Sequence, residues 1–271
     1  DAKEYTTRFT YNLYGDTTAT TGPLFETKAE YDQAGRKIND TDRRGIKTEY
    51  KYNYRNLLTE KRRDGTLLER NAYYKDDQLQ QSYDGEGHRT FYEYDKLKRP
   101  VREVAELGRV TEYAHSTSQR TTTITSPEAI STVQTYDVRG NLVSTETAGA
   151  KTSFEYDLAN NKTRQTLPEG NVWRYAFNNL NLVESISAPE GNNTAFTYDL
   201  VGRKDTHTDG NNIATSFDYD NSGNLTEIHY AGALKVSQRY DANNNLEELT
   251  KPAQGKISYG YDKLNRLIKQ Q

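Results

Sequence analysis

The sequence predicts an all-β fold of tandem β-hairpins joined into one continuous antiparallel sheet that curves like a solenoid. Three observations predict this fold. An aromatic–Asp motif recurs about every 21 residues along almost all of the 271-residue chain. Gly or Asn usually stands four residues after the aromatic, and hydrophobic residues are only 33% of the chain although it contains 22 Tyr. A fixed period of roughly 20–50 residues is typical of repeat proteins, so we expect one array over residues 1–271, about thirteen units without an internal domain boundary.

The composition excludes several classes of protein. Aromatic residues make up 11% of the chain and the net charge is only −3, whereas disordered chains have few aromatics and a high net charge. The chain has no Cys, so disulfides, thiolate metal sites and a cysteine nucleophile are excluded. No apolar run approaches the roughly 18 residues of a membrane span. Neither half of the chain is basic, so we expect no nucleic-acid partner.

The repeated motif places an aromatic residue immediately before an acid. Its clearest copies are Tyr31-Asp32, Tyr94-Asp95, Tyr136-Asp137, Tyr156-Asp157, Tyr198-Asp199, Tyr219-Asp220, Tyr240-Asp241 and Tyr261-Asp262. Weaker copies keep the period at Tyr11-Asn12, Tyr52-Asn53, Tyr74-Lys75 and Phe177-Asn178. The gap between Tyr94 and Tyr136 is two periods long, and a degenerate copy around Tyr113 is expected to fill it.

The motif predicts a hairpin turn. Gly35, Gly140, Gly202 and Gly223 stand four residues after the aromatic, and Arg36 and Arg203 follow two of them. Gly and Asn adopt positive φ readily, and an Asp side chain accepts hydrogen bonds from backbone N–H groups two residues on. We therefore expect a type I turn closed by a left-handed residue, next to a β-bulge. The same turn is expected at Gly15, Asn56, Gln78, Lys98, Asn160, Asn181, Asn244 and Asn265.

A second turn signal lies midway through the units, at residues 41–45, 167–170, 188–191, 208–210 and 251–255. Two turns per unit leave two strands of roughly six or seven residues, or about 26 strands in all. Aromatics two residues apart, as in 194–198 and 215–219, share one face of a strand. We expect aromatics in equal register to stack as cross-strand ladders, which would replace a thick aliphatic core.

The unit Tyr-Asp-x-x-Gly-Arg resembles the RHS/YD repeat, most closely at 31–36, 136–142 and 198–203, and the resemblance extends over the whole chain. The resemblance implies a sheet that spirals into a hollow shell. It also implies relatives among exported bacterial RHS proteins, the B and C components of insecticidal Tc toxins, and animal teneurins. In polymorphic toxins such a shell holds a variable C-terminal toxin, and a core region that follows the repeats cuts the toxin free with aspartate residues.

The function implied by the resemblance is structural. We expect a non-catalytic shell segment of a secreted bacterial toxin, with a secreted or cell-surface location. Its partners would be neighbouring repeats and a C-terminal toxin or cargo domain of the same polypeptide. The chain has no Met, lacks the Asp-Pro-x-Gly core motif and ends inside a repeat, so we expect a fragment of a longer array. Open first and last strands would then allow edge-to-edge self-association.

An alternative function remains open. Tyr-rich repeats of similar length occur in choline-binding cell-wall modules, so the array could be a carbohydrate-binding or adhesion module with glycans as partners. Those modules rely on repeated Trp, and this chain has a single one, Trp173. Trp173 is therefore expected to pack in a ladder, and the shell hypothesis is favoured.

Residues with metal-binding or catalytic chemistry form no recognisable site in the sequence. His88, His115, His207 and His229 lack metal-ligand spacings, and no Gly-x-Ser-x-Gly motif is present. The repeated Asp residues could form a calcium ladder, but Asn and Lys75 replace them without breaking the period, which favours turn capping. We predict no enzyme activity, no catalytic residue, no cofactor and no metal.

Overall fold

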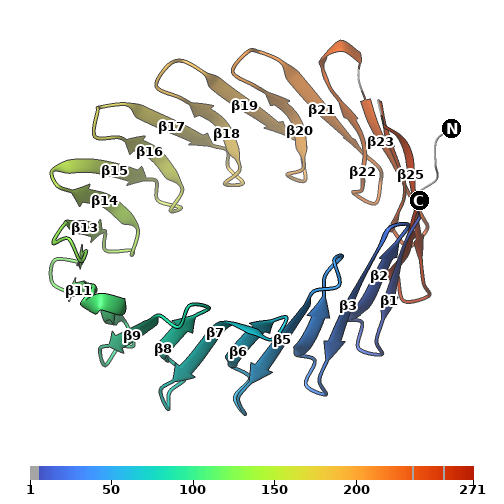
Figure 1. The fold of residues 1–271 in the computed structure, drawn as a ribbon. Helices are drawn as coiled ribbons and strands as arrows, with labels where there is room; N and C mark the ends of the chain where they lie inside the picture. The colour runs from blue at the N-terminus through green and yellow to red at the C-terminus, as the bar shows by residue number, and fades with distance from the viewer. Residues whose placement is uncertain (1–5, 234, 253) are drawn as a thin grey trace. The chain divides into compact units, whose positions relative to one another are not determined.

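A computed structural model describes residues 6–233, 235–252 and 254–271. Within these residues the secondary structure consists of 26 strands and two 3-10 turns, η1 (Glu106–Gly108) and η2 (Ala231–Ala233) (Figure 1). The first ten strands are β1 (Thr7–Tyr11), β2 (Thr17–Gly22), β3 (Phe25–Tyr31), β4 (Lys37–Thr41), β5 (Lys47–Tyr52), β6 (Leu58–Arg63), β7 (Thr66–Tyr73), β8 (Leu79–Asp84), β9 (Arg89–Tyr94) and β10 (Pro100–Val104). The next eight are β11 (Val110–Ser116), β12 (Thr121–Thr125), β13 (Ser131–Tyr136), β14 (Leu142–Thr147), β15 (Ala150–Tyr156), β16 (Lys162–Thr166), β17 (Val172–Phe177) and β18 (Val183–Ser187). The last eight are β19 (Asn193–Tyr198), β20 (Lys204–Thr208), β21 (Ala214–Tyr219), β22 (Leu225–His229), β23 (Lys235–Tyr240), β24 (Leu246–Lys251), β25 (Gly255–Tyr261) and β26 (Leu267–Gln270).

The chain divides into two compact units. The first comprises residues 1–111, 241–248 and 257–271, and the second comprises residues 112–240 and 249–256. In the first unit β1 to β10 pair in chain order. In the second unit β11 to β23 do the same. All of these pairs are antiparallel, so the predicted all-β architecture of tandem hairpins is confirmed.

The first strand of the chain does not have an open edge. Within the first unit β1 pairs with β26, and the Cα partners are Thr7 with Gln270 and Arg8 with Lys269. The expectation that the first and last strands are open edges is therefore wrong. The physical reason is that an unpaired edge exposes a row of backbone N–H and C=O groups, and here each strand satisfies the other.

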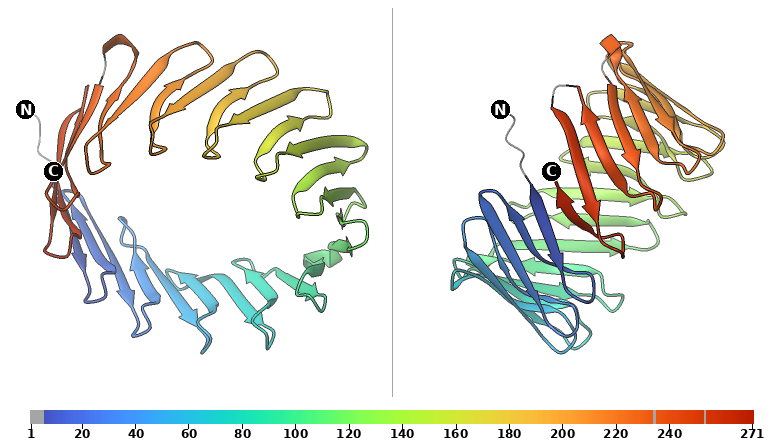
Figure 2. Two further views of the ribbon diagram at one scale, coloured as in Figure 1. Left: turned by 180° about the vertical axis from the view of Figure 1, so that it is seen from behind. Right: turned by 90° about the vertical axis from the view of Figure 1, so that its right-hand side faces the viewer.

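Neither unit has a hydrophobic core among its described residues. Among the described residues no hydrophobic side chain is fully buried, and the two buried side chains are Thr48 and Ser144. Figure 2 shows that within each unit neighbouring hairpins lie edge to edge, as strands of one layer. Stability must therefore come from contacts along the sheet, as in other nearest-neighbour arrays. The expectation that the chain lacks a thick aliphatic core is confirmed.

The aromatic ladder expected from the sequence is not formed. Within the described residues only two ring pairs are in contact, Tyr74 with Tyr94 and Phe196 with His207. Aromatics in equal register on neighbouring repeats are two strands apart. At 4.8 Å per strand their separation is about 9.6 Å, which is beyond stacking distance. A cation fills this gap instead. The Lys162 ammonium lies 5.6 Å from the ring centre of Phe154 and 4.9 Å from that of Tyr175.

The second turn of each repeat varies more than the first in which residue closes it. Gly45, Gly170, Gly191 and Gly255 have positive φ, as turn-closing residues require. In the turn predicted at 208–210 the closing residue is Asn212 (φ 60°) rather than Gly210, because the backbone hydrogen bonds run from Asp209 to Ile213. Residues 84–87 form a further turn midway through a repeat, in which the N–H of Gly87 donates to the carbonyl of Asp84.

Candidate functional site

The acid of the repeat motif caps its own turn. In the first unit Asp32 Oδ1 accepts hydrogen bonds from the backbone N–H groups of Ala34 (2.9 Å) and Arg36 (3.0 Å). The N–H of Gly35 donates to the carbonyl of Asp32, and a β-bulge at Glu30/Tyr31 precedes the turn. The same pair of bonds to Oδ1 recurs at Asn12, Asn53, Asp95, Asp137, Asp157, Asn178, Asp199, Asp220, Asp241 and Asp262. Asn serves as well as Asp because each bond needs only an oxygen acceptor.

The residue that closes this turn has positive φ at nearly every predicted position. These residues are Gly15, Gly35, Asn56, Lys98, Gly140, Asn160, Asn181, Gly202, Gly223, Asn244 and Asn265. The exception is Gln78. There Asp77 has the positive φ (71°), and the turn runs from Tyr74 to Gln78. The repeat aromatic of this unit is therefore Tyr73 and the capping position is held by Tyr74, so the assignment of Tyr74-Lys75 to the motif is wrong by one residue.

The side chain that follows the closing residue links one turn to the next. Arg36 donates from Nε to Asp32 Oδ2 (2.6 Å) and from Nη1 to the carbonyl of Asn53 in the next turn (3.2 Å). Its guanidinium also lies 5.0 Å from the ring centre of Tyr52. Where this position is Asn, the amide makes the link instead. Asn141 donates to Asp137 Oδ2 and to Asn160 Oδ1.

The hydroxyl of the repeat tyrosine forms a second link between hairpins. Tyr52 donates to the carbonyl of Lys37 at 2.9 Å, and Lys37 is the fifth residue after the capping Asp32 of the preceding turn. Donor and acceptor occupy the same relative positions in Tyr31–Thr17, Tyr73–Leu58, Tyr156–Leu142, Tyr198–Val183, Tyr219–Lys204, Tyr240–Leu225, Tyr261–Leu246 and Tyr11–Leu267. This hydroxyl link explains why Tyr rather than Phe dominates the motif.

The electrostatics of the repeat follow from these contacts. The pKa of Asp32 lies below its usual value because the Arg36 side chain and backbone N–H donate to the carboxylate. The Asn224 amide and backbone N–H lower the pKa of Asp220 in the same way. Partial burial raises the pKa of the repeat tyrosines Tyr31, Tyr73, Tyr94, Tyr156, Tyr198, Tyr219 and Tyr240. The acids of the motif thus stay charged and the phenols stay protonated donors.

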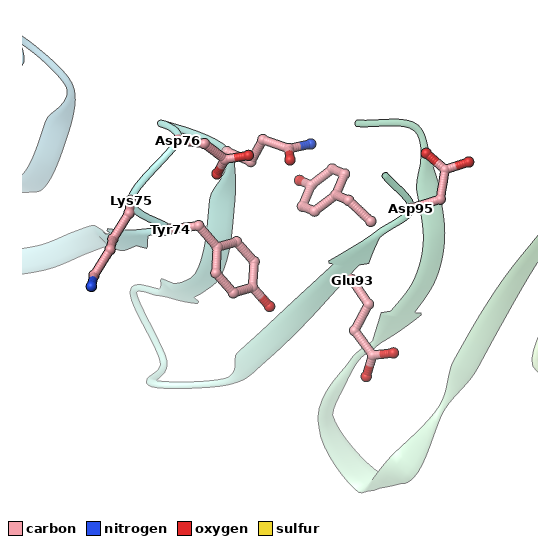
Figure 3. A pocket seen from close by; sticks show the side chains of 7 residues that line it. Tyr74, Lys75, Asp76, Glu93 and Asp95 are labelled. Carbon is pink, nitrogen blue, oxygen red and sulfur yellow. The ribbon is translucent and has the colours of Figure 1, made fainter. Parts of the chain in front are cut away.

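An open pocket of about 740 Å³ lies where the motif departs from its pattern. Figure 3 shows Tyr74 and Asp76 reaching it from the turn after β7, and Glu93 and Asp95 from β9 and the residue after it. The rings of Tyr74 and Tyr94 meet edge to face, with centres 6.3 Å apart. Each lining carboxylate already has a cation, since Asp76 pairs with Lys98, Glu93 with Arg102 and Asp95 with Arg99. The pocket therefore presents two aromatic rings, ion-paired carboxylates and the side chains of Lys75 and Gln78.

Trp173 lies in a second pocket, in the second unit, and makes no ring–ring contact among the described residues. The pocket measures about 440 Å³ and is also lined by Ile186, Pro189, Asn171 and Asn192. Trp173 is paired across strands with Gln165. Among the described residues Trp173 therefore does not take part in the aromatic ladder that the sequence led us to expect.

The four histidines occupy different environments. His207 stacks on Phe196 with ring centres 5.0 Å apart, and His115 Nδ1 contacts the hydroxyl of Thr122. His88 Nδ1 lies 3.0 Å from Asp84 Oδ2, and its Nε2 lies 3.0 Å from Glu106 Oε2. His229 contacts Asp218 on β21 and Glu227 on its own strand β22, a cluster that the spacing of the histidines did not indicate.

One protein family matches more than half of the chain. Residues 112–271 match the family described as Teneurin YD-shell, and these residues are more than half of the chain. The chain belongs to the Teneurin YD-shell family. The resemblance to RHS/YD repeats is thereby confirmed, and a shell-forming structural role follows from YD-shell membership. No protein matches in the comparison with curated sequences.

The solved structures that match this chain share little sequence with it and have TM-scores below 0.5. One match is a crystal structure of TcdB2-TccC3-Cdc42, with 14% identity, a TM-score of 0.47, and 97% of this chain and 19% of that chain covered. Another is the Tc holotoxin pore of Photorhabdus luminescens, with 14% identity, a TM-score of 0.48, and 96% and 19% of the two chains covered. TcdB2-TccC3 matches at 14% identity and a TM-score of 0.46, with 97% and 19% covered. The chain thus spans about a fifth of each of these structures, and its assignment rests on the YD-shell match.

Membrane insertion through a helix finds no support in the described residues. The helical segments there are three-residue 3-10 turns, and none is long and apolar enough to cross a bilayer.

Proposed function

We propose that the chain is a non-catalytic wall segment of a YD-repeat shell that encloses a C-terminal toxin or cargo domain of the same polypeptide, in a secreted bacterial toxin. The observation that carries the proposal is the pair of links between hairpins, Arg36 to Asn53 and Tyr52 to Lys37, which recur along the chain. Such links hold a single-layer sheet together without a core, as a wall requires. On this proposal residues 1–271 form one uninterrupted array, its partner is the cargo, and it is secreted or surface-located.

Enclosure is tested by asking which face of the sheet meets the cargo. Thr215 and Ser216 are consecutive residues of β21, so their side chains point to opposite faces. A photo-crosslinking residue is placed at each position in the full gene product that contains this chain. We expect one position to crosslink to the segment downstream of the repeats and the other to give no such product. Equal labelling from both faces, or none from either, would contradict enclosure.

A second candidate function, glycan binding, is favoured by the pocket beside Tyr74. Tyr74 is 37% exposed. Aromatic rings stack on sugar rings, and the carboxylates that line the pocket can accept hydrogen bonds from sugar hydroxyls. A glycan array with the 271-residue chain tests this function, with Tyr74→Ala and Trp173→Ala as variants. Saturable binding that Tyr74→Ala abolishes would favour the adhesion module over the cargo wall.

A further inference from the structure

The hairpin of β21 and β22 places two carboxylates directly opposite each other. Asp218 and Glu227 are Cα partners in the antiparallel register, at the position just before the repeat aromatic. Like charges directly opposite each other destabilise a sheet. Ten other hairpins have a described pair at the equivalent position, and none of these pairs brings two like charges together: Thr10–Ala19, Glu30–Asn39, Lys51–Glu60, Ala72–Gln81, Glu93–Arg102, Thr135–Ser144, Glu155–Arg164, Ala176–Ser185, Thr197–Thr206 and Gly260–Lys269.

An imidazole completes this acidic pair. His229 stands two residues after Glu227 in β22, so it lies on the same face of the sheet. Its Nε2 lies 2.7 Å from Asp218 Oδ2 and 3.2 Å from Glu227 Oε2. One ligand atom from each of the three residues lies within 4.8 Å of the other two. Tetrahedral ligands about 2.0–2.2 Å from a zinc ion are roughly 3.3–3.5 Å apart, so small side-chain rotations bring the three donors to that spacing.

The orientation of Glu227 is fixed from outside the cluster. Lys235 on β23 donates from Nζ to Glu227 Oε1 at 2.6 Å, which leaves Oε2 directed at His229. A partner on the other carboxylate oxygen orients a metal ligand in the same way as the outer-shell hydrogen bonds of known metal sites. The Thr226 hydroxyl donates to the backbone carbonyl of Asp218 (3.1 Å) and anchors the facing strand.

We infer that Asp218, Glu227 and His229 bind one divalent cation of the zinc class on the face of the sheet opposite Phe217 and Tyr219. One imidazole and two carboxylates suit zinc, cobalt or nickel, with water completing the coordination. Calcium is disfavoured because it takes six to eight oxygen ligands. Bound metal neutralises the carboxylates that face each other across the two strands.

The test is a zinc titration of the untagged, metal-stripped 271-residue chain by isothermal titration calorimetry. We expect one equivalent of Zn²⁺ to bind, an excess of Ca²⁺ not to compete, and Co²⁺ to give the visible absorption of a four-coordinate site. His229→Gln and Glu227→Gln are expected to weaken Zn²⁺ binding roughly tenfold or more, as loss of a metal ligand should.

Asp218→Asn separates metal binding from an ordinary ion-pair network. It removes the repulsion between facing carboxylates, so we expect the metal-free variant to melt at the same or a higher temperature while losing the zinc-dependent rise in melting temperature. Glu155→Gln is the matched control, because Glu155 holds the same position in β15 but faces Arg164. We expect Glu155→Gln to bind Zn²⁺ like the parent chain. Absence of saturable binding, or equal binding by Asp218→Asn, would overturn the inference.

Discussion

Arg266, in the last repeat turn, donates from Nη1 to the carbonyl of Asn12 in the first repeat turn, 3.1 Å away in space and 254 residues away in sequence. Its guanidinium lies 4.9 Å from the ring centre of Tyr11, and the Tyr11 hydroxyl donates to the carbonyl of Leu267. Arg203 makes the equivalent contacts with Asp220 and Tyr219, which belong to the next repeat along the chain. The last repeat therefore contacts the first repeat as if it were the next one along the chain.

Arg266→Ala should loosen the first strand although it lies at the other end of the sequence. The variant loses the hydrogen bonds to Asn12 and Asp262 and the contact with the Tyr11 ring, and a loss of about 1 kcal/mol already increases local opening about fivefold. We expect about fivefold faster amide exchange in β1 and β26, measured by hydrogen–deuterium exchange mass spectrometry. Arg203→Ala is the control and should speed exchange around β20 and β21 instead. If Arg266→Ala leaves β1 exchange unchanged, the link carries no stability.

Tyr219→Phe tests the hydroxyl link between hairpins. The variant keeps the ring beside Arg203 but loses the hydrogen bond to the carbonyl of Lys204 (2.9 Å). We expect a loss of about 1 kcal/mol in the free energy of unfolding, measured by urea denaturation. Tyr175→Phe is the control. Tyr175 lies two residues before the repeat aromatic, outside the hydroxyl link, so its variant should stay within about 0.5 kcal/mol of the parent chain.

Local chemistry made the period and the turn predictable from sequence. An Asp or Asn cap followed by a residue with positive φ, as in Asp32 and Gly35, depends only on residues within one turn. The same locality explains the error at Tyr74. Tyr73 and Tyr74 are both aromatic and no acid marks the capping position, so the sequence alone leaves the register ambiguous by one residue.

Contacts between neighbouring repeats were harder to predict because they depend on register across several strands. The ladder expectation failed because the returning strand of each hairpin separates rings such as Phe154 and Tyr175, and Lys162 lies between them. The cluster at Asp218 did leave a signal in the sequence. Asp218 and Glu227 are nine residues apart, as are Lys51 and Glu60, which form a cross-strand ion pair. Aligning all units on this spacing would have revealed the facing acids.

Gly202→Val tests the left-handed turn. Gly202 has φ 86°, a conformation that strains a β-branched residue, and an added Cβ would lie 3.4 Å from Leu182 Cδ1. We expect a loss of roughly 1–3 kcal/mol in the free energy of unfolding, measured by thermal or urea denaturation. Gly202→Asn should be tolerated better, because Asn181 occupies the equivalent position with φ 59°. Equal stability of the Val and Asn variants would contradict the assignment of strain to this turn.

The capping acids should make the fold sensitive to low pH. The pKa of Asp220 is lower in the folded chain because the Asn224 side chain and backbone N–H donate to its carboxylate, and Asp157 receives the same contacts from Asn161. A group whose pKa falls on folding contributes stability above its unfolded pKa of about 3.9, and this contribution is lost as pH falls through the folded pKa. We therefore expect the urea midpoint to fall between about pH 5 and pH 2.

Removing an acid from one cap and adding an acid to another should change the acid-induced fall of the urea midpoint in opposite directions. Asp220→Asn keeps the Oδ1 acceptor, as Asn178 shows with its bonds from the N–H groups of Leu180 and Leu182. Its urea midpoint should therefore stay near that of the parent chain at pH 7 and drop less on acidification. Asn178→Asp adds an acid at the same position of another unit and should steepen the drop. Parallel pH profiles for all three proteins would show that the acids act only as neutral acceptors, because a charged cap must couple stability to its own protonation.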